Sequence, residues 1–524
     1  MGFRCANCGG NILFDADSQS MKCQHCGSMI PPDQFNVKNK STGEEIPEME
    51  LTLFTCSGCG AELHGTEDSQ VGFCPYCGGQ SLLRSPGGDK TMPERIIPFQ
   101  VSKDRCADLF KKHTQRIMYL PRELKNAAHL KSFTGIYMPY YEYDVELGAS
   151  HITGTKMVKS TPKYDVINTY QINASVSGNY CGVPYDASKY YDDEIAARCL
   201  PFDMEKEKPF NAAYLSGFYA DASTVPAETY YRDAEQTASS DIVDEVSVQV
   251  LRQQGIKVEK EKSSVEAHTK GHHSTMFPLW FLTWRKDQRV AYAVVNGESG
   301  KVVSDLPVDM KAFSIGCVVT TAALFLLLEI FFQPTPLLTS VLSLFAAILM
   351  AASIRASVKR IYEKETHVND KGWTGKKEPV IQETGTVTKI RKKTSDSNGL
   401  EIILLIGVFA ISILRNTDVM QMKLIGRIAS VVGLVFLLFT VAKILSWQKS
   451  IPQKQPVLAI IPVLGAAILN AAIIFISPVN DFWYYLGDAV CILILIISSV
   501  FMLQVYNIGT TRPLPRLFDR EEVQ

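Results

Sequence analysis

The sequence predicts a multidomain membrane protein with two four-cysteine zinc ribbons, a cytosolic α+β domain and a C-terminal α-helical membrane domain of about six spans. Three features predict it: four Cys-x-x-Cys pairs before residue 80, a middle part with both strand and helix periodicity, and repeated apolar runs after Lys311. The 524 residues are 46% hydrophobic with a mean hydropathy of +0.03. This composition excludes a wholly soluble enzyme, a disordered tail protein and a secreted disulfide scaffold.

Eight of the thirteen cysteines form two matched units. In each unit two Cys-x-x-Cys pairs are separated by fourteen residues, and the second unit repeats the first at an offset of 51. Two thiolates at this spacing fit one edge of a zinc tetrahedron, and the glycine after each pair permits the tight turn. The predicted metal ligands are Cys5, Cys8, Cys23 and Cys26 in ribbon 1 (1–30), and Cys56, Cys59, Cys74 and Cys77 in ribbon 2 (52–84).

Two structural Zn²⁺ ions are the predicted cofactors, because four thiolates leave no open position for catalysis. Redox disulfides and iron are the alternatives, and a reducing cytosol disfavours the disulfides. Each ribbon has little core of its own, so metal binding is expected to supply much of its folding free energy. The segment 28–51, with Pro31-Pro32, resembles a flexible linker that lets the first ribbon swing freely.

Residues 92–308 are predicted to form the α+β domain. Helices are expected over 102–118 and 228–254, long strands over 135–147 and 164–180, and a β-meander over 279–304. The aromatic residues there are expected in the core. The stretch Gly297-Glu-Ser-Gly-Lys301 lacks the spacing of a phosphate loop and predicts a hairpin turn. His268, His272 and His273 are expected in a solvated loop, an adventitious metal site being the alternative. No catalytic residue is predicted, and we expect no enzyme.

Six windows are long enough to cross a bilayer. They form a transmembrane hairpin within 312–354 (312–332 and 337–354), and four spans within 399–506 (399–414, 424–445, 457–476 and 484–505). A basic cytosolic loop (355–398) separates the two groups, and a cytosolic tail (507–524) follows.

The distribution of basic residues predicts the orientation. The segments 355–398, 448–455 and 507–524 hold eleven, two and three Lys/Arg, whereas the turns 333–336, 416–423 and 477–483 hold only Lys423. By the positive-inside rule, both termini are cytoplasmic and the protein is a multi-pass protein of the cell membrane. No apolar segment of a cleavable signal peptide is found at the start.

The predicted spans contain few ionisable or polar residues that could serve transport. Their ionisable residues, Asp488 among them, lie near the ends of the windows, and Asn470 is the strong polar residue well inside one. We therefore expect an anchor. The loop 355–398 is predicted either to bind anionic lipid headgroups or only to fix the topology; the candidate residues are Arg355, Lys359, Arg360, Lys389, Arg391, Lys392 and Lys393.

Zinc ribbons usually bind nucleic acid or protein, and the charge of the ribbons distinguishes these two roles. Residues 1–85 carry five basic and ten acidic side chains, whereas phosphate recognition requires a basic face. The acidic ribbons predict a protein partner and no nucleic acid.

Four further motifs accompany the ribbons: Arg95-Ile-Ile-Pro-Phe99, Gly135-Ile-Tyr-Met-Pro-Tyr140, Phe277-Pro-Leu-Trp280 and Val295-Asn-Gly-Glu-Ser-Gly-Lys301. With the C-terminal spans, this ordered set resembles the bacterial membrane-anchored double zinc-ribbon proteins that accompany phage-shock-protein-A-like, TPM-domain and SPFH (flotillin-like) proteins in envelope-stress systems. Such proteins are often labelled replisome-organiser or primosomal-helicase-like. The resemblance covers the whole chain, but the nucleotide-binding loop of a helicase is missing.

Two functions remain open. The resemblance and the acidic ribbons together imply a membrane zinc-binding adaptor that recruits cytosolic or membrane-associated stress-response proteins to the bilayer. The alternative is a membrane-tethered nucleic-acid-associated factor. An oligomer is compatible with either.

Overall fold

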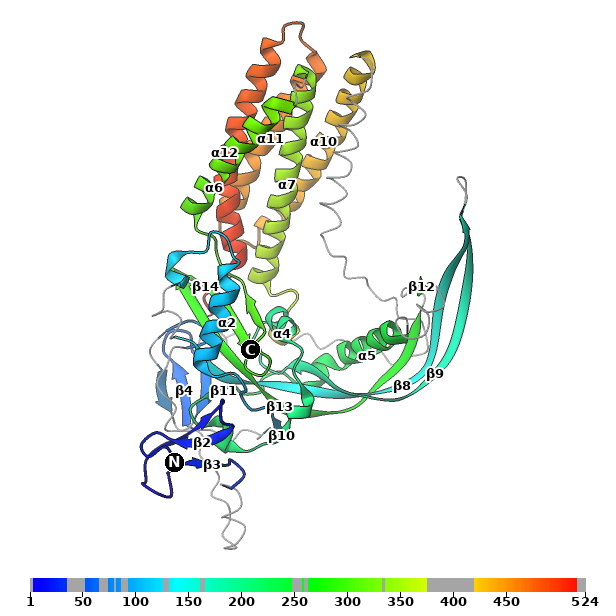
Figure 1. Ribbon diagram of the computed structural model, residues 1–524. Helices are drawn as coiled ribbons and strands as arrows, with labels where there is room; N and C mark the ends of the chain where they lie inside the picture. Colours follow the sequence, from blue (N-terminus) through cyan, green and yellow to red (C-terminus); the bar gives the residue numbers. More distant parts are fainter. Residues whose placement is uncertain are drawn as a thin grey trace.

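The computed structural model describes residues 3–34, 52–65, 74–79, 82–85, 93–125, 132–160, 165–246, 257–258, 263–331, 335–374 and 419–515. A β-rich part, called here the sheet domain (residues 52–308), stands end to end with a helical bundle formed by the C-terminal part of the chain (Figure 1). The first ribbon lies at the end of the sheet domain away from the bundle (Figure 1). The coarse prediction of cysteine clusters, a mixed domain and a C-terminal helical region is confirmed.

The first ribbon is a three-stranded antiparallel sheet of β1 (Ile12–Asp15), β2 (Ser20–Cys23) and β3 (Met29–Ile30). It does not swing on a linker. Ile12 and Phe14 enter the hydrophobic core shared with the sheet domain, and the Phe14 ring packs edge-on against Tyr214 at 5.1 Å. The Ser216 hydroxyl donates to Ile12 O at 2.7 Å. The expectation of a free first ribbon is therefore wrong.

Within the described residues, the large sheet has thirteen strands, with the main path β10–β7–β13–β8–β11–β5–β4–β6. The remaining strands attach at the sides, β9 and β12 to β8, β14 to β13, and both β15 and β16 to β14. The strands are β4 (Thr52–Cys56), β5 (Glu62–Gly65), β6 (Leu82–Ser85), β7 (Arg95–Ile96), β8 (Thr134–Ser160), β9 (Asp165–Asp186), β10 (Lys208–Pro209), β11 (Tyr219–Ala220), β12 (Lys257–Val258), β13 (Ser264–Lys286), β14 (Arg289–Asn296), β15 (Val302–Ser304) and β16 (Arg512–Pro513).

The second ribbon is part of this sheet. Its strands β4, β5 and β6 are joined to β8 through β11, which pairs with β5 on one side and with β8 on the other. Residues 52–84 were predicted to form a separate ribbon. The sequence does not show their connection to the sheet, because the connecting strand β11 has only two residues, lies far along the chain and has no periodic pattern.

Two long strands, β8 and β9, form a curved antiparallel arm, and β13 extends along part of β8 (Figure 1). The helix α5 (Tyr231–Val246) runs along this arm and buries Ala234 and Ala238 against Tyr143 and Val183. The other helices of the sheet domain are α2 (Lys103–Gln115), α4 (Asp193–Cys199) and the short 3₁₀ turns η1 (Arg122–Lys125), η2 (Met204–Lys206), η3 (Ala212–Leu215) and η4 (Ala227–Tyr230).

Stacked aromatic rings fill the centre of the sheet domain. Phe99 stacks on Phe218 with ring centroids 4.2 Å apart and packs against Trp280 at 5.0 Å. Glycines make room for these rings, since a Cβ on Gly297 would lie 2.6 Å from Phe99 and one on Gly135 would lie 2.6 Å from Phe218. The Phe99, Gly135, Trp280 and Gly297 motifs of the sequence therefore meet in one core.

The C-terminal part contains α6 (Met310–Phe331), α7 (Pro336–Thr366), α8 (Lys371–Thr374), α10 (Val419–Gln448), α11 (Gln455–Ile476) and α12 (Phe482–Thr510). Four helices, α7, α10, α11 and α12, are long and apolar enough to cross a membrane, whereas the described apolar stretch of α6, Met310–Thr320, is shorter. The window 399–414 lies outside the described residues. The described residues thus hold four candidate spans, whereas about six were expected in the whole chain.

Candidate metal centres

The same turn is built four times around the cysteine pairs. The glycine after each pair has a positive φ, +69° at Gly9, +73° at Gly27, +79° at Gly60 and +69° at Gly78. Its N–H donates to the carbonyl of the first cysteine of the pair, at 2.8–3.1 Å. Because L side chains are strained in this region, glycine is required at these positions. The role predicted for the four glycines is confirmed.

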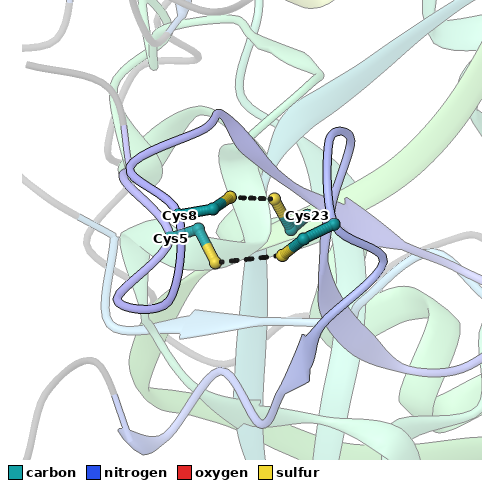
Figure 2. A group of neighbouring side chains, drawn as sticks. Cys5, Cys8 and Cys23 are labelled. Atoms are coloured by element: carbon teal, nitrogen blue, oxygen red, sulfur yellow. Dashed lines mark hydrogen bonds between the residues drawn. The ribbon is translucent and has the colours of Figure 1, made fainter.

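The first cluster brings four sulfurs to one point. Figure 2 shows Cys8 facing Cys23, with the sulfurs 3.5 Å apart, and the Sγ of Cys5 lies 3.6 Å from that of Cys26. In a tetrahedron with Zn–S bonds of about 2.3 Å, neighbouring sulfurs are about 3.8 Å apart. The four thiols are therefore arranged for one tetrahedral metal ion.

The second cluster has the same geometry. Cys56 and Cys77 sulfurs lie 3.5 Å apart, and those of Cys59 and Cys74 lie 3.7 Å apart. All eight cysteines are unlinked by disulfides. The eight predicted ligands thus form two groups that could each hold a metal ion. A four-thiolate tetrahedron accepts zinc or a single iron, so the geometry fits the predicted zinc and leaves the iron alternative to a metal analysis.

Nearby polar groups support the thiolate form, which is the form that binds metal. The His25 N–H points at Cys23 Sγ and the Gly79 N–H at Cys77 Sγ, both at 3.4 Å. The Ser28 hydroxyl lies 3.1 Å from Cys26 Sγ, and its hydrogen bond, followed by those of the Ser28 backbone and the Cys8 thiol, lowers the pKa of Cys26 to about 6. These contacts orient the sulfurs and stabilise their negative charge.

The two clusters differ sharply in exposure. The four cysteines of the second are fully buried, at 0% exposure, among the hydrophobic residues of the sheet domain. In the first, Cys8 and Cys26 are exposed, as are the turn residues Asn7 and His25. The second site is therefore a structural element of the core, whereas the first presents its two turns to solvent.

A tyrosine inside the second cluster ties it to the sheet domain. Tyr76, between Cys74 and Cys77, donates its hydroxyl to Asp221 Oδ2, which also accepts from the Ser188 hydroxyl. Burial, and next the Asp221 charge, hold the pKa of Tyr76 well above its usual value. The backbone carbonyl of Tyr76 accepts a hydrogen bond from Tyr292 on β14. Sequence reasoning missed this residue, although a tyrosine inside a Cys-x-x-Cys pair is a usable signal.

Ion pairs join the sheet domain to the bundle. The Arg289 guanidinium at the start of β14 bonds to Glu365 in α7 and to Ile508 O and Thr511 O at the end of α12. Next to it, Arg512 Nε donates to Asp192 Oδ2 at 3.0 Å, just after the chain leaves α12 and joins β14 as β16. The predicted tail 507–524 thus starts inside α12 and then enters the sheet.

A second contact of the junction centres on Asp305. Its carboxylate lies 3.0 Å from Lys364 Nζ and 2.9 Å from Arg198 Nη1. Burial alone would raise the pKa of Asp305, but the surrounding Lys364, Arg198 and Arg512 outweigh it and lower the pKa to about 2. A cavity of about 610 Å³ lies beside these contacts, with Tyr76, Arg289, Gln453 and Arg512 in its wall. It therefore adjoins the second ribbon, the sheet and the bundle.

The residues of the other predicted sites do not come together in one described cluster. Arg355, Lys359 and Arg360 lie on α7, where the Arg355 guanidinium sits 5.4 Å from the Phe439 ring centroid. The basic residues Lys389, Arg391, Lys392 and Lys393 lie outside the described residues. The histidines predicted in a loop, His268, His272 and His273, lie instead in strand β13. His273 lies between two carboxylates, with Nδ1 2.7 Å from Glu94 Oε2 and Nε2 3.4 Å from Asp144 Oδ2.

The fold and the two sites define a class: a protein with two tetracysteine sites suited to zinc and a helical bundle suited to a membrane. A Bacillus subtilis (strain 168) protein described as uncharacterized protein YdjG is 25% identical over 319 residues, which is 59% of this chain and 90% of YdjG. No protein-family model matches, and no solved structure gives a significant match.

Proposed function

We propose that this chain is a membrane-anchored zinc-binding adaptor that recruits phage-shock-type or SPFH-type stress-response proteins to the inner face of the cell membrane. The observation that carries the proposal is the unequal exposure of the two ribbons. The second is embedded in the sheet domain, while the first presents the turns 6–9 and 24–27 to solvent at the end of the domain away from the bundle.

The junction supports an adaptor role. Arg289, Arg512 and Asp305 join the sheet domain to the ends of α7 and α12 through several hydrogen bonds and ion pairs. The first ribbon also shares a core with the sheet domain. A partner bound at its exposed turns would therefore be held at a fixed distance from the membrane.

The test uses the purified full chain in nanodiscs and purified phage-shock-protein-A-like, TPM-domain and SPFH proteins of the same organism. His25→Glu and Met29→Glu alter the exposed surface of the first ribbon, where Met29 is 57% exposed, and leave its four sulfurs in place. We expect at least one of these proteins to bind, and these variants to lose the binding while keeping two zinc ions. Met118→Glu, at a 70% exposed methionine elsewhere, is the matched control.

Two outcomes contradict the proposal. Unchanged binding by His25→Glu and Met29→Glu would move recruitment away from the first ribbon. Salt-dependent binding of duplex or single-stranded DNA that disappears with these variants would favour the nucleic-acid alternative.

A further inference from the structure

Polar side chains of three helices lie at one level inside the bundle near its far end, the end away from the sheet domain. Ser340 lies four residues after the start of α7, Asn470 six residues before the end of α11, and Asp488 six residues after the start of α12. At a rise of about 1.5 Å per residue, all three lie about 6–9 Å from that end.

Contacts between the helices place these side chains at one level. Two contacts join α11 to α12 here: a methyl group on Gly487 would collide with Ile473, and Cys491 Sγ lies 3.3 Å from Ala466 O. Asn470 lies between Ala466 and Ile473 on α11, and Asp488 lies between Gly487 and Cys491 on α12. Gly426 of α10 approaches both Ile474 and Val341. The four helices therefore converge around this layer.

The polar atoms of this layer are buried and incompletely paired. Asn470 is 0% exposed, and among the residues that the structure describes neither its Oδ1 nor its Nδ2 has a hydrogen-bond partner. Asp488 is 6% exposed; its Oδ2 accepts from the Ser340 hydroxyl at 3.4 Å, while its Oδ1 has no hydrogen-bond partner in the described part of the chain. A carboxylate and an amide left unpaired in hydrocarbon are costly, and such residues usually mark a functional site.

No positive charge neutralises Asp488 among the described neighbours. On α7 the side chains near it are the hydroxyls of Thr339, Ser340 and Ser343, and on α12 its titratable neighbour Cys491 is bonded to Ala466 O. Arg427 of α10 directs its guanidinium to Phe475 O at the end of α11.

We propose that Asp488, Asn470 and Ser340 form an intramembrane binding site for one small monovalent cation, Na⁺ or a proton. The donor set consists of carboxylate, amide and hydroxyl oxygens, which suit hard cations, and the single carboxylate balances one positive charge. The occupant takes the free Asp488 Oδ1 and, in the case of Na⁺, Asn470 Oδ1 as well. This site is independent of the ribbons and of the proposed adaptor function.

The experiment measures the thermal stability of the full chain in nanodiscs at equal ionic strength in sodium, potassium or choline chloride, over a range of pH. We expect Na⁺ to raise the melting temperature of the wild type at alkaline pH, or acidification without Na⁺ to do so. Asp488→Asn should abolish the sodium response, or remove the part of the acid response that comes from this site, and Asn470→Leu should lower the apparent affinity for Na⁺ by roughly tenfold or more. Asp481→Asn, at the exposed residue before α12, is the matched control and should respond like the wild type.

A sodium effect that Asp488→Asn removes assigns Na⁺. A difference in pH response between the wild type and Asp488→Asn, without a sodium effect, assigns the proton, because other carboxylates such as Glu142 titrate alike in both proteins. Equal responses to all three salts, together with the same pH response in the wild type and in Asp488→Asn, would overturn the proposal, as would a full sodium response retained by Asp488→Asn. If Asp488→Asn does not fold, Asn470→Leu and Ser340→Ala decide, because an unchanged response in both variants also overturns it.

Discussion

Glu142 is a buried carboxylate in the sheet domain, with Arg95 as its positive neighbour. It is 3% exposed, its Oε1 has no hydrogen-bond partner within the described ranges, and Arg95 lies 3.9 Å from its Oε2. Burial, followed by the nearby Glu207 charge, raises the pKa of Glu142 from 4.5 to about 7. The fold therefore favours the protonated form.

The raised pKa of Glu142 sets the direction of a pH dependence. It gives a contribution to stability that is complete below the unfolded pKa and is lost as the pH rises through 7. We expect Glu142→Gln, which keeps the neutral form, to match the wild type near pH 4 and to exceed its unfolding free energy by roughly 1–3 kcal/mol at pH 8. Glu146→Gln, at an exposed carboxylate paired with Lys270, should show no such trend. Thermal melts across pH provide the measurement.

Gly78 gives a second test at the scale of one residue. Its φ of +69° is strained for any L residue, so Gly78→Ala should lower the unfolding free energy by roughly 1–2 kcal/mol and weaken metal binding at the second cluster. Gly178→Ala, at an exposed position of strand β9 with no atom within 4 Å of the new methyl group, should be close to neutral. If Gly78→Ala and Gly178→Ala changed the melting temperature and the zinc affinity in a competition assay equally, the role given to the left-handed turn would be contradicted.

At the scale of the elements, the two ribbons should release metal at different rates. The sulfurs of Cys8 and Cys26 are reachable by a chelator, whereas all four cysteines of the second cluster are buried in the core. We expect two zinc ions per chain by elemental analysis and a biphasic release to a chromogenic chelator. The slow phase should follow unfolding of the sheet domain, because metal binding and folding are coupled there.

Substitution assigns the two phases. Cys8→Ser should remove the fast phase and leave the slow one, whereas Cys59→Ser should strongly destabilise the sheet domain itself. A single phase, a bound iron or one metal ion per chain would contradict two zinc sites of unequal burial.

At the scale of the whole molecule, the ion pairs of the junction decide whether the bundle and the sheet domain act as one body. Asp305 has its pKa lowered to about 2, so its contribution to stability is present above the unfolded pKa of about 4 and is lost as the pH falls toward 2. Asp305→Asn leaves Lys364, which is 9% exposed, without its partner. We expect a loss of roughly 3 kcal/mol at neutral pH.

The comparison of acid titrations tests this junction. The stability of the wild type should fall between about pH 4 and 2 by more than that of Asp305→Asn, which lacks the titrating group. Asp17→Asn, at an exposed carboxylate of the first ribbon, should follow the wild type. Parallel acid curves for all three proteins would show that the junction does not contribute to stability.

The sequence alone determined the eight cysteines as two clusters, the four glycines that follow them and the apolar character of the C-terminal helices. These features depend on spacing and periodicity over a few residues, which the backbone turn and the helix repeat fix locally. The β-meander was predictable for the same reason, since β13, β14 and β15 follow one another with short turns.

Only the tertiary structure decided which ribbon is buried, how the bundle is fixed to the sheet and which polar residues meet inside it. Arg512 bonds to Asp192, 320 residues away, and Tyr76 bonds to Asp221, 145 residues away. The sequence shows that Asp488 lies near the end of a predicted span, but it does not show the contact of Asp488 with Ser340 of another helix. Such pairings depend on how distant segments pack, and local patterns carry no information about that.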